Sequence, residues 1–415
     1  MSTSKRSLIL LIIFLLGYEI VLYLTVADKQ PLWHDEGHFI ETIKYLADDL
    51  SLERLKNYNE MSTPLPFLVY ALWGKIVSFE LPALRLLSLT ISFFTFLSFY
   101  FFFRSWYDDT KTALILTGFL IFQPYMIGVT VFVYTDMLTM FFLATSLISL
   151  HKYKPIIFSV SMAGGLLCRQ YLIFWCLATF IYFLWSFYIQ RDRRHIEMML
   201  SILVAMLPIG LLFLFWKGLS PQNALHKQYV SEGLSFHFSF IVFYICMFLI
   251  YLLPLIVIRR RSFYRNIKIY FVAFILSGGY LLYPIKASQP AEQAGVFTTG
   301  YFHRFIRWMV NESCEHLVFY LVFLLSLPVF IHLSIRLYRQ RRNRSSQRSL
   351  FSDLAIFSFL ITMAFSYVNW EKYLLPVIPL AILSILGEDG LFNNGKSKLG
   401  ISNQPDKSSR GNRQK

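Results

Sequence analysis

Residues 8–26 (LILLIIFLLGYEIVLYLTV) form the first apolar run of the chain, and residues 33–38 (WHDEGH) begin the polar segment that follows it. An apolar run of this length predicts a helix that crosses a membrane. The polar segment places two adjacent carboxylates, Asp35 and Glu36, between imidazoles. Charged groups beside a membrane are costly, so they indicate a site that binds a substrate or moves a proton. The alternative is a hydrated loop in which one carboxylate only caps a helix that starts near Phe39.

The composition is that of a membrane protein, because 56% of the 415 residues are hydrophobic, only 15% are charged, and long apolar runs recur. We therefore predict an all-α fold, a polytopic transmembrane helical bundle. The first run lacks a small-residue cleavage site and is expected to be a retained span rather than a signal peptide. Residues 1–388 are predicted to form one multispanning catalytic domain. Residues 389–415, rich in Gly, Ser, Asn and Lys, are expected to be a disordered cytoplasmic tail.

Basic residues give the chain a net charge of +15 and fall in clusters between the apolar runs. The clusters are residues 5–6, 104–111, 152–154, 191–194, 259–268 and 339–348, and the tail from Lys396. This is the positive-inside pattern of membrane proteins, which assigns the clusters to the cytoplasm. It accounts for the basic charge without a nucleic-acid partner, and no nucleic acid is predicted to bind.

With the basic clusters inside, the chain is predicted to cross the membrane about twelve times, with both termini in the cytoplasm. An external turn is expected around Gly128 and another at residues 168–170, and Arg85 is expected near the outer headgroups. Every polar segment of chemical interest then lies on the external side. These segments are residues 27–81, 130–136, 169–170, 217–237, 286–316 and 369–372.

The first external segment has helical periodicity of its own. Phe39, Ile43, Leu46 and Leu50 recur at the spacing of one helix face, which predicts an amphipathic helix lying along the surface. Two prolines at residues 63–66 (TPLP) then predict an extended turn before the chain becomes apolar again. Such a loop could hold the carboxylates against a groove between bilayer and water.

Two further polar sites interrupt the apolar sequence. Asp136 lies near the outer end of the fourth predicted span, where it must be paired or face a cavity. It could also form only an interhelical hydrogen bond or cap a helix. Arg169 could hold phosphate in a bidentate fork, and Gln170 offers an amide to a hydroxyl. The alternative is that Arg169 reaches the headgroups as a membrane anchor.

The later external loops carry cations, against the positive-inside trend. The relevant residues are Lys217, His226, Lys227, His237, Lys286, His303, Arg304 and Arg307. Cations outside favour an anionic ligand, although contact with anionic membrane lipid is the alternative for any single lysine. His226 and His237 have no third ligand at a useful spacing and the four cysteines lack metal-like spacing, so neither a metal nor a disulfide framework is predicted.

Five short motifs occur in order within roughly the first 175 residues: DEGHF at 35–39, TPLP at 63–66, LRLL at 84–87, YTD at 134–136 and CRQ at 168–170. In this order and on one membrane side they resemble the GT-C superfamily of membrane glycosyltransferases. The closer resemblance is to the dolichyl-phosphate-glucose α-1,2-glucosyltransferases of N-glycan precursor assembly and their prokaryotic relatives.

The resemblance implies a GT-C-like bundle that acts as a polyprenyl-phosphate-sugar-dependent hexosyltransferase. The donor would be a polyprenyl- or dolichyl-phosphate-sugar, and the acceptor a glycan or glycolipid. It implies an active site on the non-cytoplasmic face, outside a prokaryotic plasma membrane or, alternatively, in the lumen of the endoplasmic reticulum. No cofactor is expected, and the sequence has no glycine loop for a nucleotide-linked donor.

Glycosyl transfer assigns roles to the motif residues. Asp35 is the candidate general base for an inverting single displacement, and Glu36 the second catalytic carboxylate. Arg169, with a cation from a later loop, would stabilise the departing phosphate. The predicted substrate-binding residues are His38, Asp136, Arg169, Gln170, Lys217, His226, Lys227, His303 and Arg304.

A transporter or flippase of a lipid-linked saccharide is the main alternative. It would predict charged residues near the middle of the bilayer and pseudo-symmetric broken helices. The polar groups of this chain instead gather in segments on one side of the membrane, which favours an enzyme.

Overall fold

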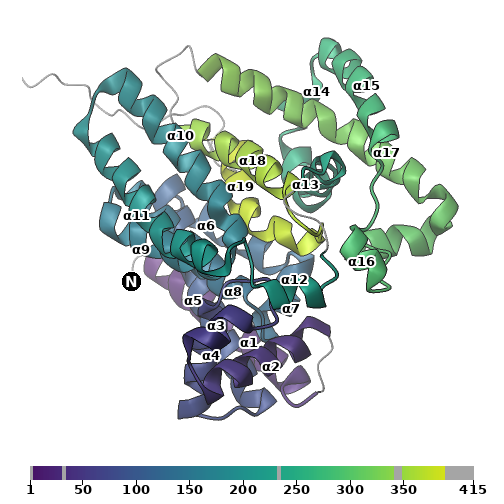
Figure 1. The fold of residues 1–415 in the computed structure, drawn as a ribbon. Coiled ribbons are helices and arrows are strands. Elements are labelled where there is room, and N and C mark those ends of the chain that lie inside the picture. Colours follow the sequence, from purple (N-terminus) through teal and green to yellow (C-terminus); the bar gives the residue numbers. More distant parts are fainter. Residues whose placement is uncertain (1–2, 30–33, 231–234, 341–347, 388–415) are drawn as a thin grey trace, which may run out of the picture.

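The computed structural model describes residues 3–29, 34–230, 235–340 and 348–387, and these are helical without any strand (Figure 1). The predicted all-α fold is therefore confirmed. Trp33 and the predicted disordered tail at 389–415 lie outside the described residues.

The helices follow the apolar runs of the sequence. The first half of the chain forms α1 (Thr3–Val26), α2 (His34–Asp48), α3 (Leu52–Asn57), α4 (Leu65–Ile76), α5 (Leu81–Tyr107), α6 (Thr110–Ile121), α7 (Pro124–Val131), α8 (Asp136–His151), α9 (Pro155–Leu166), the 3-10 helix η1 (Gln170–Leu172) and α10 (Ile173–Gln190). The second half forms α11 (Arg193–Trp216), α12 (Gln222–Lys227), α13 (Phe238–Ile258), α14 (Arg260–Tyr264), α15 (Ile267–Leu282), α16 (Gln289–Gln293), α17 (Tyr301–Gln340), α18 (Arg348–Ala364), the 3-10 helix η2 (Glu371–Val377) and α19 (Ile378–Leu386).

Six helical segments among the described residues are long and apolar enough to cross a membrane. They are α1, α5, η1 with α10, α11, α13 and α17. A seventh candidate is the pair α6 and α7, which bends by 76°, and five further apolar helices have 10–17 residues. These helices are compatible with an integral membrane protein.

The bend between α6 and α7 comes from Pro124. Gln123 before it is extended and Pro124 begins α7, since a proline restricts the preceding residue and cannot continue the hydrogen bonding of α6. Gly128 lies inside α7, so the external turn expected around Gly128 is wrong. The chain turns instead at Gln123 and again after α7.

Helix α2 confirms the predicted amphipathic periodicity, and its buried face packs inside the protein. Phe39, Ile43 and Leu46 are buried, whereas Leu50 follows the end of the helix and is exposed. The Phe39 ring packs at 5.5 Å, centroid to centroid, from Phe67 of α4. The apolar face of α2 is therefore covered by α4, because two short amphipathic helices can bury each other's stripes.

The prolines of the TPLP motif start a helix rather than only an extended turn. Pro64 has helical dihedral angles at the N-cap of α4, and Pro66 lies in its first turn, where a proline needs no backbone donor. Thr63 Oγ1 donates to the Leu166 carbonyl (2.9 Å) and Leu65 N to the Leu167 carbonyl (3.0 Å). The first polar segment is thereby tied to the end of α9.

The connections predicted to share one side of the membrane meet at one end of the bundle. Trp216 Nε1 donates to the Leu55 carbonyl (3.1 Å), and Asn369 Nδ2 donates to the Lys286 carbonyl (2.9 Å). In Figure 1 this end carries α2, α3 and α4 at the bottom, with α12 above them. We call it the polar end.

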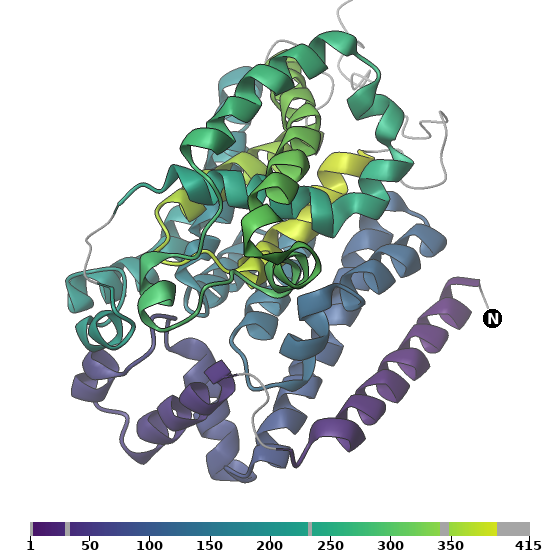
Figure 2. The ribbon, with the colours of Figure 1, turned by 90° about the vertical axis from the view of Figure 1, so that its right-hand side faces the viewer.

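Several basic connections gather at the other end of the bundle. Arg259 follows α13 and donates to the carbonyl of Leu386 at the end of α19 (3.0 Å). Arg336 near the end of α17 pairs with Asp353 near the start of α18. In Figure 2 the N-terminal end of α1 lies at the right, on the opposite side from the purple helices α2 and α3 at the lower left. We call this the basic end.

Candidate functional site

Glu36 has a structural position at the polar end. It lies in the first turn of α2, is fully buried, and accepts two hydrogen bonds from Arg85 of α5 (Nε to Oε1, 3.0 Å; Nη2 to Oε2, 2.6 Å). Its Oε1 also accepts from the backbone of Val133 (3.0 Å). Arg85 in turn donates to the Lys29 carbonyl (2.8 Å), so the pair joins α2, α5 and the segments next to them.

This geometry changes two sequence expectations. Arg85 is not exposed to lipid headgroups, because its guanidinium is enclosed with a carboxylate that neutralises it. Both oxygens of Glu36 are bonded to protein groups, and the side chain is inaccessible. Glu36, expected to be a second catalytic carboxylate, instead holds the first turn of α2 in place.

Asp35, the neighbour of Glu36, faces the other way. Its side chain is 48% exposed, and Oδ2 accepts from Lys372 Nζ at 2.5 Å. Lys372 comes from η2, is mostly buried, and lies 4.9 Å from the centre of the Tyr134 ring. The contact brings together two residues from nearly opposite ends of the sequence.

Asp136 and Arg169 form a second ion pair. Asp136 begins α8, Arg169 lies between α9 and η1, and Nη2 donates to Oδ2 at 2.8 Å. Both side chains are buried, which confirms the requirement that Asp136 be paired and excludes the anchoring alternative for Arg169. Within the described residues, Arg169 Nε and Asp136 Oδ1 are buried without a hydrogen-bond partner, so the pair has unused hydrogen-bonding capacity inside the protein.

The two pairs share one electrostatic environment. Burial alone would raise the pKa of Asp35, but Lys372 and Arg169 together hold it below its usual value. Burial would lower the pKa of Lys372, but Asp35 and Asp136 raise it. Asp35 is therefore a carboxylate and Lys372 an ammonium at neutral pH.

Glu60 is a third carboxylate at this site, and the sequence analysis missed it. It is buried in the connection between α3 and α4. Burial, with a further contribution from the charge of Asp35, raises the pKa of Glu60 to about 8, while Lys227 and Arg169 act in the opposite direction. Glu60 is thus mostly protonated at neutral pH, whereas the neighbouring Asp35 is ionised. Two carboxyl groups with pKa values this far apart are typical of a catalytic acid and base. Its position just before the TPLP motif was the available signal.

Gln170 connects two segments next to the site through hydrogen bonds. Its Nε2 donates to the Met61 carbonyl (2.6 Å) and to Ser220 Oγ (3.3 Å), and Ser220 also donates to Met61 (3.0 Å). The backbone next to Glu60 is therefore fixed to η1 and to the connection after α11. The amide nitrogen expected to meet a substrate hydroxyl is already engaged with protein groups.

The remaining predicted residues lie around the site or away from it. His38 is half-buried one turn after Asp35, with Nδ1 3.9 Å from Glu41. Lys217, His226 and Lys227 are exposed, and only Lys227 has a charge that acts on Glu60. The cation that contacts Asp35 is therefore Lys372, which was not among the predicted substrate-binding residues.

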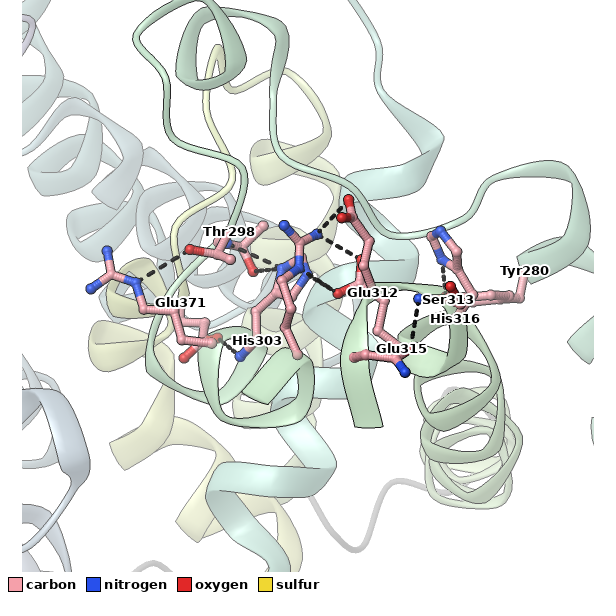
Figure 3. Close-up of polar contacts among 12 residues, drawn as sticks. Tyr280, Thr298, His303, Glu312, Ser313, Glu315, His316 and Glu371 are labelled. Carbon is pink, nitrogen blue, oxygen red and sulfur yellow. Dashed lines mark hydrogen bonds and ion pairs between the residues drawn. The ribbon is translucent and has the colours of Figure 1, made fainter. Parts of the chain in front are cut away.

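His303 and Arg304 belong to a separate cluster, shown in Figure 3. His303 is buried with Nε2 3.3 Å from Glu315, which also accepts two hydrogen bonds from Arg307 (2.8 and 2.7 Å). The helix α17 is kinked at Asn311 (φ 60°, ψ 174°), and these contacts hold its two parts together across the kink. His303 thus has a folding role here.

Arg304 lies on the exposed side of α17. Its Nε donates to Thr298 Oγ1 at 3.2 Å (Figure 3). Among the described residues it forms no hydrogen bond or ion pair with Asp35, Lys372, Arg169 or Asp136, so the structure does not bring Arg304 into the site.

Glu371 connects this cluster to the site. Its carboxylate accepts from the backbone of Phe302 (3.0 Å) and His303 (2.9 Å) and from Tyr251 Oη (2.8 Å). A carboxylate at a helix N-terminus satisfies free N–H groups and favours the helix dipole. Because Lys372 is the next residue, one turn of chain fixes both the start of α17 and the cation beside Asp35.

No protein family, curated protein or solved structure matches this chain. Among the described residues, no group of three or more His, Cys, Asp or Glu side chains could hold a metal ion.

Proposed function

We propose that the chain is a GT-C-type membrane glycosyltransferase that moves a hexose from a polyprenyl- or dolichyl-phosphate-linked sugar to a lipid-linked or cell-surface glycan. The observation that carries the proposal is the half-exposed Asp35 carboxylate, kept ionised by Lys372 and flanked by Arg169 and Glu60. A base for a hydroxyl and cations for a phosphate are the two requirements of this transfer.

In the proposed reaction, the acceptor hydroxyl oxygen attacks the anomeric carbon of the donor sugar. The bond between that carbon and the phosphate oxygen breaks, and the electron pair leaves with the lipid phosphate. The hydroxyl proton passes to Asp35, so a single displacement inverts the anomeric configuration. Asp35 must be ionised beforehand, and the Lys372 contact maintains that state.

The buried cations supply the complementary charge. Lys372 and Arg169, whose charges both act on Asp35, would stabilise the negative charge of the phosphate. Asp136 positions Arg169 through its 2.8 Å contact. Protonated Glu60 would donate a hydrogen bond to a sugar hydroxyl or phosphate oxygen.

The proposal extends to the membrane. The six long helices, the bent pair α6–α7, four of the shorter apolar helices (α8, α9, α15 and α18) and η2 with α19 would make about twelve spans. The polar end would face away from the cytoplasm because the basic connections lie at the other end. The membrane would be a prokaryotic plasma membrane or, alternatively, the endoplasmic reticulum.

A transporter or flippase of a lipid-linked saccharide is the second candidate. The broken helix pair α6–α7 and the buried Glu19 within α1 are the observations that favour it. The paired charges at one end favour chemistry at an interface, so we prefer the enzyme.

Mass spectrometry of lipids and glycans tests the proposal. Cells with the wild-type protein should contain a glycan or glycolipid that carries one hexose more than in cells without it, and cells with Asp35→Asn should lack this species. A flippase would change how much finished lipid-linked saccharide accumulates without creating a species one hexose larger. Identical glycans and lipids in all three strains would contradict the proposal.

A further inference from the structure

A cavity of about 570 Å³ opens at the basic end, away from Asp35. It lies between α14 with the residues after it and the last turns of α17. Arg261 and Arg265 line it from one segment, and Arg336, Arg339 and His332 line it from α17. Among the described residues, no acidic side chain lines it. Arginines separated widely in the sequence thus converge on one hollow.

Only one of these arginines is neutralised within the described part of the chain. Arg336 Nε donates to Asp353 Oδ2 (2.7 Å) and Nη2 to Ser384 Oγ (2.7 Å), and Asp353 is fully buried. Arg261, Arg265 and Arg339 are exposed. None of the three has an ion pair or hydrogen bond to another described residue. Three unneutralised guanidinium groups around one cavity repel one another, and an anion would remove that repulsion.

Membrane topology alone does not explain this arrangement. The connection between α10 and α11 is also basic, with Arg191, Arg193 and Arg194. There Arg193 lies 3.5 Å from Glu197, and none of the three lines the cavity. The positive-inside rule requires such charges to be near the cytoplasm but does not require them to converge. Convergence on a concave surface is a property of binding sites.

We propose that this cavity binds the phosphate of an anionic lipid headgroup. The planar fork of arginine matches phosphate oxygens, and basic pockets between membrane helices suit anionic lipids. The lipid rather than a free phosphate is favoured because α15 leads away from the cavity with an exposed apolar stripe. Ile267, Phe271 and Phe274 form that stripe, 78%, 69% and 65% exposed, where acyl chains can lie.

Native mass spectrometry of the purified protein tests the proposal, with phosphatidylglycerol as the probe and phosphatidylcholine as the uncharged comparison. The cavity variant is Arg261→Gln with Arg265→Gln and Arg339→Gln, which leaves the Arg336–Asp353 pair intact. The control is Arg191→Gln with Arg193→Gln and Arg194→Gln, which removes the same charge elsewhere. We expect the cavity variant to bind phosphatidylglycerol at least about ten-fold more weakly and the control within about two-fold of wild type.

The corresponding triple Lys variant of the cavity restores the charge and checks that the fold is intact. It should regain part of the affinity, because lysine binds phosphate without the fork. If the Gln cavity variant and the control lost the same affinity for phosphatidylglycerol, binding would depend on the overall surface charge and not on the cavity, and the proposal would be overturned. Displacement of the lipid by millimolar inorganic phosphate would assign the cavity to free phosphate and overturn the lipid assignment. These measurements report lipid binding and not glycosyl transfer, so their outcome does not depend on the proposed function.

Discussion

Asp35 and Glu36 are neighbours with opposite environments. Successive residues of a helix point about 100° apart. In the first turn of α2, this rotation directs Glu36 toward Arg85 inside the protein and Asp35 toward Lys372 near the surface. One carboxylate therefore stabilises the fold while the other remains accessible.

Glu36→Gln should destabilise the protein strongly, because it leaves the Arg85 guanidinium buried without its counter-charge. Breaking a buried pair in this way costs about 3–5 kcal/mol. Thermal or denaturant unfolding in detergent measures the loss. Glu41→Gln, the same substitution at an exposed position of α2, should change stability by less than about 0.5 kcal/mol. Equal stability of the two variants would contradict the structural role assigned to Glu36.

Glu60 should make stability depend on pH. Its pKa is about 8 in the folded protein against an ordinary 4.5, so unfolding at intermediate pH releases a proton. Its contribution to stability is complete below pH 4.5 and is lost as the pH rises toward 8, by up to about 1.4 kcal/mol per pH unit. Melting curves of Glu60→Gln between pH 5 and 8 should be flatter against pH than those of wild type. An unchanged pH slope would show that Glu60 ionises normally.

At the scale of elements, η2 connects the site to α17 through adjacent residues. Glu371 holds the N-terminus of α17 and Lys372 contacts Asp35. Gly300, just before α17, is enclosed so closely that an added Cβ atom would lie 2.2 Å from Tyr125 Oη and 2.5 Å from the carboxyl carbon of Glu371. A larger side chain at Gly300 should therefore displace Glu371, and with it the neighbouring Lys372 that contacts Asp35.

Gly300→Ala should displace Glu371 and with it Lys372, lowering both stability and activity. Steric insertion of this kind costs about 1–3 kcal/mol. Gly278→Ala, within α15, has nothing within 4 Å of the added Cβ and should be neutral or slightly stabilising. Unfolding curves and activity of the two variants give the comparison. Wild-type behaviour of Gly300→Ala would show that η2 tolerates the displacement.

The helices were predictable from the sequence because their signals are local. Apolar runs predicted most of the long helices, and the spacing of Phe39, Ile43 and Leu46 predicted the buried face of α2. Pro124 is also a local signal, and the chain bends there rather than at Gly128. The contact between Asp35 and Lys372 was not predictable, because no local pattern relates residues that far apart.

At the scale of the molecule, two chemically different ends define the proposed orientation. The polar end carries the site and the basic end carries the arginine cavity. Single cysteines in a background without the four native ones test this orientation with a membrane-impermeant reagent. His226→Cys and Arg304→Cys should react from outside the cell, and Arg193→Cys only after permeabilisation. Reaction of all three from the same side would contradict it.

The central claim is that Asp35 is the general base of a glycosyl transfer. The most direct measurement is steady-state turnover of purified Asp35→Asn with a polyprenyl-phosphate-hexose donor, alongside wild type and Glu41→Gln. Loss of a general base lowers the rate by about a hundred- to ten-thousand-fold. The account predicts this loss for Asp35→Asn, with normal turnover for Glu41→Gln and melting temperatures that show all three proteins folded. Turnover of folded Asp35→Asn within a few-fold of wild type would contradict it.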